Sequence, residues 1–159
     1  MKVPTLYLDT SVIGGGFDDE WKDATLELFQ QAGGGLYRVV TSVVAQREVQ
    51  SAPPRVQEQF ATLFPDSSRV HVLTDEAESL AHAYVAAGVV TAKYTDDARH
   101  VAIATVQGVG VIVSWNFHHL ANLRREAGFN AVNLLQGYPQ VRILSPLELI
   151  HENDEEEDL

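Results

Sequence analysis

Short apolar runs alternate along the sequence with longer stretches in which apolar residues recur every three or four positions. The short runs suit strands of a parallel sheet, which are buried on both faces, and the longer periodicity suits amphipathic helices. The predicted strands cover residues 3–8, 37–41, 70–73, 111–113 and 141–144. The predicted helices cover residues 21–32, 43–52, 60–64, 75–88, 95–105, 118–127 and 130–138, with a final turn at 146–150. This alternation predicts an α/β fold with three layers, α/β/α, and a mainly parallel central sheet.

Two of the predicted helices begin with residues that commonly cap a helix. Ser42 precedes the helix that carries Glu48, and Pro53 follows that helix. Thr74 or Asp75 caps the next strongly periodic stretch, with Glu78 in the capping-box position for Asp75.

Composition limits the class of protein. The chain has 159 residues, of which 45% are hydrophobic and 21% charged, so we expect one globular domain, at residues 1–150. The formal net charge is −11, and six of the acidic residues fall within 151–159, which we predict to be a disordered tail. The absence of cysteine excludes thiolate metal sites. No apolar run reaches the roughly 18 residues that cross a bilayer, so we predict a cytoplasmic protein without membrane contact.

Acidic and amide side chains stand where a parallel sheet places its ligand site. Asp9 follows the first predicted strand and Asn116 the fourth, while Glu48 and the pair Asp96-Asp97 lie on helices. Ligands of such sheets bind beyond the carboxyl ends of the strands, where the strand order reverses. Carboxylates that converge there repel one another unless a cation neutralises them, and hard oxygen donors suit Mg²⁺ or Mn²⁺. A phosphodiester substrate fits such a site.

Each of these residues also has a purely structural interpretation. Asp9 could cap a helix or turn, Asp96 could cap its own helix, and Asn116 could stabilise a turn. Glu48 could lie on a solvated helix face. Trp115 fits either packing or stacking on a base.

Taken in order, the motifs resemble the PIN-domain ribonucleases, in particular VapC-like toxins of bacterial toxin–antitoxin pairs. The resemblance spans about residues 3–150. It is carried by Leu6-Tyr7-Leu8-Asp9-Thr10-Ser11, by Ser42-Val43-Val44 leading to Glu48, by Asp97-Ala98-Arg99-His100-Val101-Ala102-Ile103-Ala104, and by Val111-Ile112-Val113-Ser114-Trp115-Asn116.

The resemblance implies a Mg²⁺- or Mn²⁺-dependent endoribonuclease that hydrolyses RNA, with an antitoxin protein as partner and pairing into a homodimer. It implies catalytic and metal-binding roles for Asp9, Glu48, Asp97 and Asn116. Asn116 stands where the family has an acid, so it keeps an oxygen ligand but loses a charge that would hold a second metal ion. The other residues to which we assign roles are Ser114, Thr10 and Asp96 in support of the site, and Arg47, Arg99 and His118 as contacts of RNA.

Other interpretations stay open. The strongest is a PIN scaffold with a weakened or inactive metal site that binds RNA or protein. A haloacid-dehalogenase-like phosphatase needs a second acid where Ser11 stands, and a receiver-like phosphoacceptor needs a late lysine that 109–116 lacks. For a homodimer, we expect the helix face around Leu80 and Tyr84 to be the contact surface.

Overall fold

The computed structural model describes residues 2–150, so the predicted acidic tail at 151–159 lies outside the described residues. The strands are β1 (Thr5–Leu8), β2 (Arg38–Ser42), β3 (Val70–His71), β4 (Val111–Val113) and β5 (Arg142–Leu144). The α-helices are α1 (Thr10–Ile13), α2 (Lys22–Gly33), α3 (Val43–Gln50), α4 (Pro54–Leu63), α5 (Asp75–Ala86), α6 (Thr95–Val106) and α7 (Leu123–Gln136). Short 3₁₀ turns are η1 (Gly15–Phe17), η2 (Ser67–Arg69) and η3 (Ala92–Tyr94), and residues 146–150 are helical.

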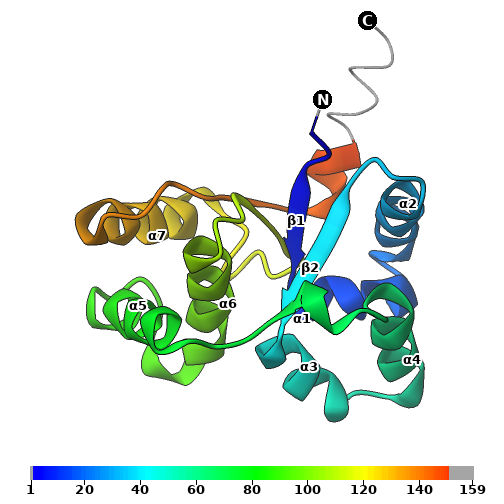
Figure 1. Ribbon diagram of the computed structural model, residues 1–159, viewed down its shortest axis with the longest axis horizontal. Helices are drawn as coiled ribbons and strands as arrows, with labels where there is room; N and C mark the ends of the chain where they lie inside the picture. The colour runs from blue at the N-terminus through cyan, green and yellow to red at the C-terminus, as the bar shows by residue number, and fades with distance from the viewer. Residues whose placement is uncertain (1, 151–159) are drawn as a thin grey trace, which may run out of the picture.

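All five strands run parallel in the order β3-β2-β1-β4-β5, which confirms the predicted sheet. Leu6 pairs with Val39 on one side and with Val111 on the other, so β1 is central. The strand order reverses between β1 and β4, because the chain turns one way from β1 to reach β2 and the other way to reach β4. The carboxyl end of β1 points toward α1 and α3 (Figure 1).

Helices cover both faces of the sheet, which confirms the three layers (Figure 1). Successive residues of a strand point to opposite faces. Tyr7 and Ile112 therefore pack with α5, α6 and α7, whereas Leu8 and Val113 pack with α1, α2 and α4. Within residues 2–150, no helix has both the length and the apolar character needed to span a membrane.

One long helix replaces the two that the sequence predicted at 118–127 and 130–138. The chain forms turns after Asn116, and α7 begins only after Asn122, whose side chain accepts a hydrogen bond from the backbone N–H of Arg125 at 2.9 Å. Gly128 lies inside α7, where the helix packs closely: a Cβ atom would lie 3.1 Å from Val89 Cγ1.

A short helix that the sequence analysis missed begins directly after Asp9, whose Oδ1 accepts the N–H of Val12 at 3.2 Å. The capping interpretation of Asp9 is thus part of its role. At α5, Thr74 is the cap and Asp75 is not.

The expectation of a dimer surface around Leu80 and Tyr84 is wrong, because these side chains are only 3% and 0% exposed and fill the core between α5, α6 and α7.

The turn after α1 packs tightly against the segment that follows β4, and this contact generates a first prediction. A Cβ atom on Gly15 would lie 2.8 Å from Thr25 Oγ1 and 2.9 Å from Trp115 Nε1, two atoms that are hydrogen-bonded to each other. Gly15→Ala should therefore lower the free energy of unfolding by about 1–3 kcal/mol. Gly33→Ala, where no atom lies within 4 Å, should be neutral or slightly stabilising. Equal thermal midpoints for the two variants would contradict this packing.

Candidate active site

Asp9 is held in one orientation at the end of β1. Its side chain is buried, and its Oδ1 accepts hydrogen bonds from Ser11 Oγ at 2.6 Å and from the N–H of Val12 at 3.2 Å. Its Oδ2 accepts a hydrogen bond from Ser114 Oγ at 2.5 Å. Because Ser114 follows β4, this bond joins the two strand ends between which the strand order reverses. Asp9 therefore lies at the switch point where parallel sheets bind ligands.

Glu48 reaches the same edge from α3 and meets His100 of α6. The distance between His100 Nε2 and Glu48 Oε1 is 2.7 Å, and Thr10 Oγ1 donates to the same oxygen at 2.9 Å. Ser42 caps the helix that carries Glu48, accepting the N–H of Val44 at 3.2 Å. Three elements thus fix the position of one carboxylate: α1, α3 and α6.

His100 continues the contact into the core. Its Nδ1 lies 2.6 Å from the hydroxyl oxygen of Tyr7, which lies 2.7 Å from Ser42 Oγ. His100 and Tyr7 are almost completely buried. The chain of contacts therefore runs from Glu48 through His100 and Tyr7 to Ser42, the residue that caps the Glu48 helix.

The charges of Glu48 and His100 stabilise each other. Burial alone would lower the pKa of His100, but the hydrogen bond to Glu48 and the charges of Asp9, Glu48 and Asp97 raise the pKa above its ordinary value. Burial would raise the pKa of Glu48, but the hydrogen bond and charge of His100 bring that pKa below its ordinary value. Both shifts favour the charged forms of the pair, in which the two nitrogens of the imidazolium would donate to Glu48 and Tyr7.

Asp97 carries a poorly compensated charge. Burial raises its pKa to about 6, the charge of His100 opposes this rise, and the charges of Asp9, Glu48 and Asp96 add to it. Burial also raises the pKa of Asp9, although His100 and the hydrogen bonds from Ser11 and Ser114 oppose that rise. The site therefore concentrates more negative charge than its own cation balances.

This surplus of carboxylate charge fits a hydrated divalent cation. Within residues 2–150, no group of three or more His, Asp or Glu side chains is arranged to hold a metal ion by itself. Mg²⁺ commonly keeps several waters and binds proteins through only one or two carboxylates, so Asp9 and Asp97 are the candidate donors. Direct metal binding by Asp9, Glu48, Asp97 and Asn116 stays a prediction.

Asn116 takes the structural role that the sequence left open for it. Its Oδ1 accepts the N–H of His119 at 2.9 Å, and its backbone carbonyl accepts those of Leu120 and Ala121 at 3.0 and 2.8 Å. Its own N–H donates to Ser114 Oγ at 2.9 Å. The amide thus shapes the turn after β4, and a direct bond to a metal ion stays a prediction.

The structure separates Asp96 from its neighbour Asp97. Asp96 Oδ1 accepts hydrogen bonds from Arg47 and Arg99, each at 2.8 Å. Burial would raise the pKa of Asp96, but the two arginines lower it below its ordinary value. Arg99 also donates twice to Glu78, at 2.8 and 2.7 Å, so its guanidinium already binds two carboxylates. Of the residues predicted to contact RNA, Arg47 and His118 are the exposed ones.

Sequence reasoning missed the part that His100, Tyr7 and Ser42 play in this site. The signal was the spacing: His100 lies three residues after Asp97 on one helix, and such residues share a helix face. Tyr7 lies two residues before Asp9, a spacing that places side chains on the same face of a strand. Neither spacing reveals that the two faces meet, because that depends on how α6 packs on β1.

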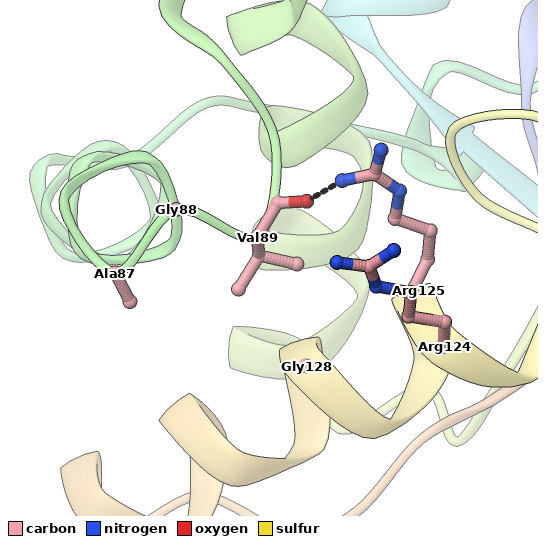
Figure 2. Close-up of a pocket in the computed structure, with 6 residues that line it drawn as sticks. All are labelled: Ala87, Gly88, Val89, Arg124, Arg125 and Gly128. Atoms are coloured by element: carbon pink, nitrogen blue, oxygen red, sulfur yellow. Dashed lines mark hydrogen bonds between the residues drawn. The ribbon is translucent and has the colours of Figure 1, made fainter.

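A surface pocket lies apart from these acids, between the end of α5 and the first turns of α7. Its lining residues include Arg124, Arg125 and Val89, and none of them is acidic. Figure 2 shows the guanidinium of Arg125 donating to the backbone carbonyl of Val89. Arg125 therefore ties the end of α5 to α7.

Comparisons with known proteins agree with this description at the level of the fold. No protein family and no curated protein matches the sequence. The chain is similar in structure to FitAcB from Neisseria gonorrhoeae, with a TM-score of 0.58, 12% identity and coverage of 89% of this chain and 98% of that one.

Two further structures are similar. VapBC2 from Rickettsia felis, bound to a DNA fragment from its promoter, gives a TM-score of 0.55 at 11% identity and covers 89% and 98% of the two chains. FitAB bound to an IR36 DNA fragment gives 0.56 at 14% identity and covers 89% and 94%. At such identities the likeness establishes the PIN-like fold of the chain.

The raised pKa of Asp97 generates a prediction about stability without metal. A carboxyl whose pKa rises from 3.8 to about 6 on folding makes the protein less stable as pH increases through that interval. In EDTA, the free energy of unfolding of Asp97→Asn should equal that of the wild type near pH 4 and exceed it above pH 6. We expect a gain of about 1 kcal/mol, discounted because the group is partly exposed.

Asp96→Asn is the matched control, because the pKa of Asp96 is lowered and its charge is stabilised by two arginines. This control should lose stability at neutral pH. Thermal unfolding across this pH range measures both variants, and a destabilised Asp97→Asn protein at pH 7 would contradict the surplus of negative charge.

Proposed function

We propose that the chain is a divalent-metal-dependent endoribonuclease and the toxin of a toxin–antitoxin pair. The observation that carries the proposal is the uncompensated charge of Asp97 beside the buried, oriented carboxylate of Asp9 at the switch point of a parallel sheet. The sequence motifs that resemble VapC-like ribonucleases include both residues.

Asp9 and Asp97 would hold Mg²⁺ or Mn²⁺, with Glu48 bonded to its waters. When bound, such an ion lowers the pKa of a water and stabilises charge that develops on a phosphodiester. Asn116 adds no charge to this set, so a second ion would depend on phosphate oxygens of the substrate.

The chain's own residues hold two of the carboxylates in place. Ser11 and Ser114 donate to opposite oxygens of Asp9, so the carboxylate cannot rotate. His100 and Thr10 both donate to Oε1 of Glu48, and His100 lowers the pKa of Glu48. An ionised Glu48 can accept a hydrogen bond from the attacking water and so orient it.

RNA must be held by local contacts, because the net charge of −11 repels a polyanion. Arg47 lies beside the site, and its side chain is 57% exposed although it also donates to Asp96. We propose it as a phosphate contact. Arg99 is a weaker candidate because its guanidinium is paired with two carboxylates.

An antitoxin is the proposed protein partner. One structural neighbour is a VapBC2 complex, whose name matches the family that the sequence motifs resemble, and two others are FitAcB and FitAB. A homodimer is proposed on the resemblance alone.

An inactive scaffold is the second candidate function. It is favoured by Asn116 in place of an acid and by the absence, within 2–150, of three acidic or histidine side chains grouped around one point. Such a protein would bind RNA or a partner protein without cutting RNA.

The enzyme and the scaffold differ in a cleavage assay on a long structured RNA. Wild-type protein should cleave it with Mn²⁺ or Mg²⁺ and not with EDTA. Asp9→Asn and Asp97→Asn should each lower the rate about 100-fold or more, because each removes a charge from the metal site. Asp23→Asn, an exposed acid on α2, is the matched control and should keep full activity.

Cleavage that persists in a folded Asp97→Asn protein would overturn the assignment of the site. RNA binding without cleavage under any of these conditions would instead favour the scaffold.

A further inference from the structure

An aromatic cluster is connected to Asp9, one of the proposed catalytic acids, through the hydroxyls of Ser11 and Ser114. Trp115 stacks on Trp21 of the turn before α2, with ring centroids 4.4 Å apart and ring planes 19° from parallel. Phe117 sets its ring edge against both, at 5.6 Å from Trp21 and 6.0 Å from Trp115. Trp115 is buried, but Phe117 is 41% exposed. The cluster thus has a packed base and an apolar ring that is open to solvent.

Hydrogen bonds hold this cluster at a fixed position relative to Asp9. The N–H of Trp115 donates to Ser11 Oγ at 2.9 Å, and the N–H of Asn116 donates to Ser114 Oγ at 2.9 Å. These two hydroxyls are the ones that bind the two oxygens of the Asp9 carboxylate. Phe117 is the next residue, so its ring is placed by the same contacts that orient Asp9.

The indole N–H of Trp115 makes the cluster rigid. It donates to Thr25 Oγ1 of α2 at 2.8 Å, which fixes the ring on which Phe117 rests. Gly15 leaves just enough room for this pair. Packing therefore explains why Trp115 and Trp21 are aromatic. It does not explain why part of the Phe117 ring is exposed to solvent.

A second exposed aromatic ring, on η1, has a cation over it. Phe17 of η1 is 38% exposed, and the guanidinium carbon of Arg55 lies 5.2 Å from its ring centroid. Exposed aromatic rings combined with arginine are typical of surfaces that bind single-stranded nucleic acid.

We propose that Phe117 is a stacking platform for an unpaired nucleobase next to the scissile phosphate. The inference rests on the proposed function and adds a residue that contacts the substrate. Stacking on an aromatic ring requires no net positive charge on the protein, so it can supply affinity that an acidic body cannot. A base inside a duplex is already stacked and cannot reach such a ring.

Binding of a short fluorescein-labelled single-stranded RNA tests the platform, measured by fluorescence anisotropy with the full chain and Mn²⁺. The Asp97→Asn background slows cleavage during the measurement and leaves the contacts of Asp9 with Ser11 and Ser114 unchanged. Adding Phe117→Ala should raise Kd about 5- to 150-fold, which corresponds to the usual contribution of one stacked base. Phe117→Trp should restore the affinity. Leu135→Ala is the matched control, because Leu135 on α7 is an exposed apolar side chain of similar size.

An RNA with an abasic nucleotide at the scissile position identifies the contact. The protein that retains Phe117 should bind the abasic RNA with a higher Kd than the intact RNA. Phe117→Ala should raise the Kd for the abasic RNA little further, because the missing base and the missing ring are the two sides of one contact. In the cleavage assay, Phe117→Ala on the otherwise wild-type chain should raise KM and change kcat little. Thermal unfolding verifies that the variant folds.

The outcomes separate the platform from the proposed function. If the wild type cleaves RNA while Phe117→Ala and Leu135→Ala leave Kd and KM equally unchanged, the platform is wrong and the ribonuclease stands. If the wild type neither binds nor cleaves RNA, both are wrong, and the exposed ring is to be assigned to contact with a protein partner. If binding depends on Phe117 but no RNA is cut, the platform stands and the enzyme does not.

Discussion

The site depends on one buried ion pair, between the imidazolium of His100 and the carboxylate of Glu48. Three further acids lie close enough to change each other's pKa values, and without an internal cation their mutual repulsion and burial would oppose folding. His100 compensates one charge and, through Tyr7, connects it to Ser42 at the start of the Glu48 helix. The acid and the helix that carries it are thus fixed by a single chain of contacts.

Two other acids at this edge of the sheet, Asp96 and Asp97, have different electrostatic environments. Asp96 is directed to arginines outside the site, which stabilise its ionised form. Asp97, the next residue, lies where burial and neighbouring acids raise its pKa to about 6. These neighbours in sequence therefore have opposite electrostatic environments. Asp96 connects α3 and α6 through its two arginines, whereas the charge of Asp97 is left for an external cation to neutralise.

Much of this arrangement could be predicted from the sequence, because it follows from local patterns. Apolar runs located the strands, and the acids that follow or face them indicated the switch point, both of which the sheet order confirms. The continuity of α7 through Gly128 could not be predicted, since the close packing of that glycine on Val89 is a tertiary contact.

The role of His100 could not be predicted for a similar reason. A lone histidine on an apolar helix face is ordinarily a core residue, and its partners Tyr7 and Glu48 are 93 and 52 residues away in sequence. Only the packing of α6 against β1 and α3 brings them together. Local patterns thus located the acids, and tertiary contacts determined what balances them.

The protonation state of His100 is the most direct measure of this account. We expect both ring nitrogens of His100 to carry a proton in metal-free, ¹⁵N-labelled protein at about pH 7, because the pKa of His100 is raised above its ordinary value of about 6.5. Glu48→Gln should lower that pKa, because it removes the partner charge. A neutral His100 ring in the wild type at this pH, or a pKa that does not respond to Glu48→Gln, would contradict the claim that this ion pair organises the site.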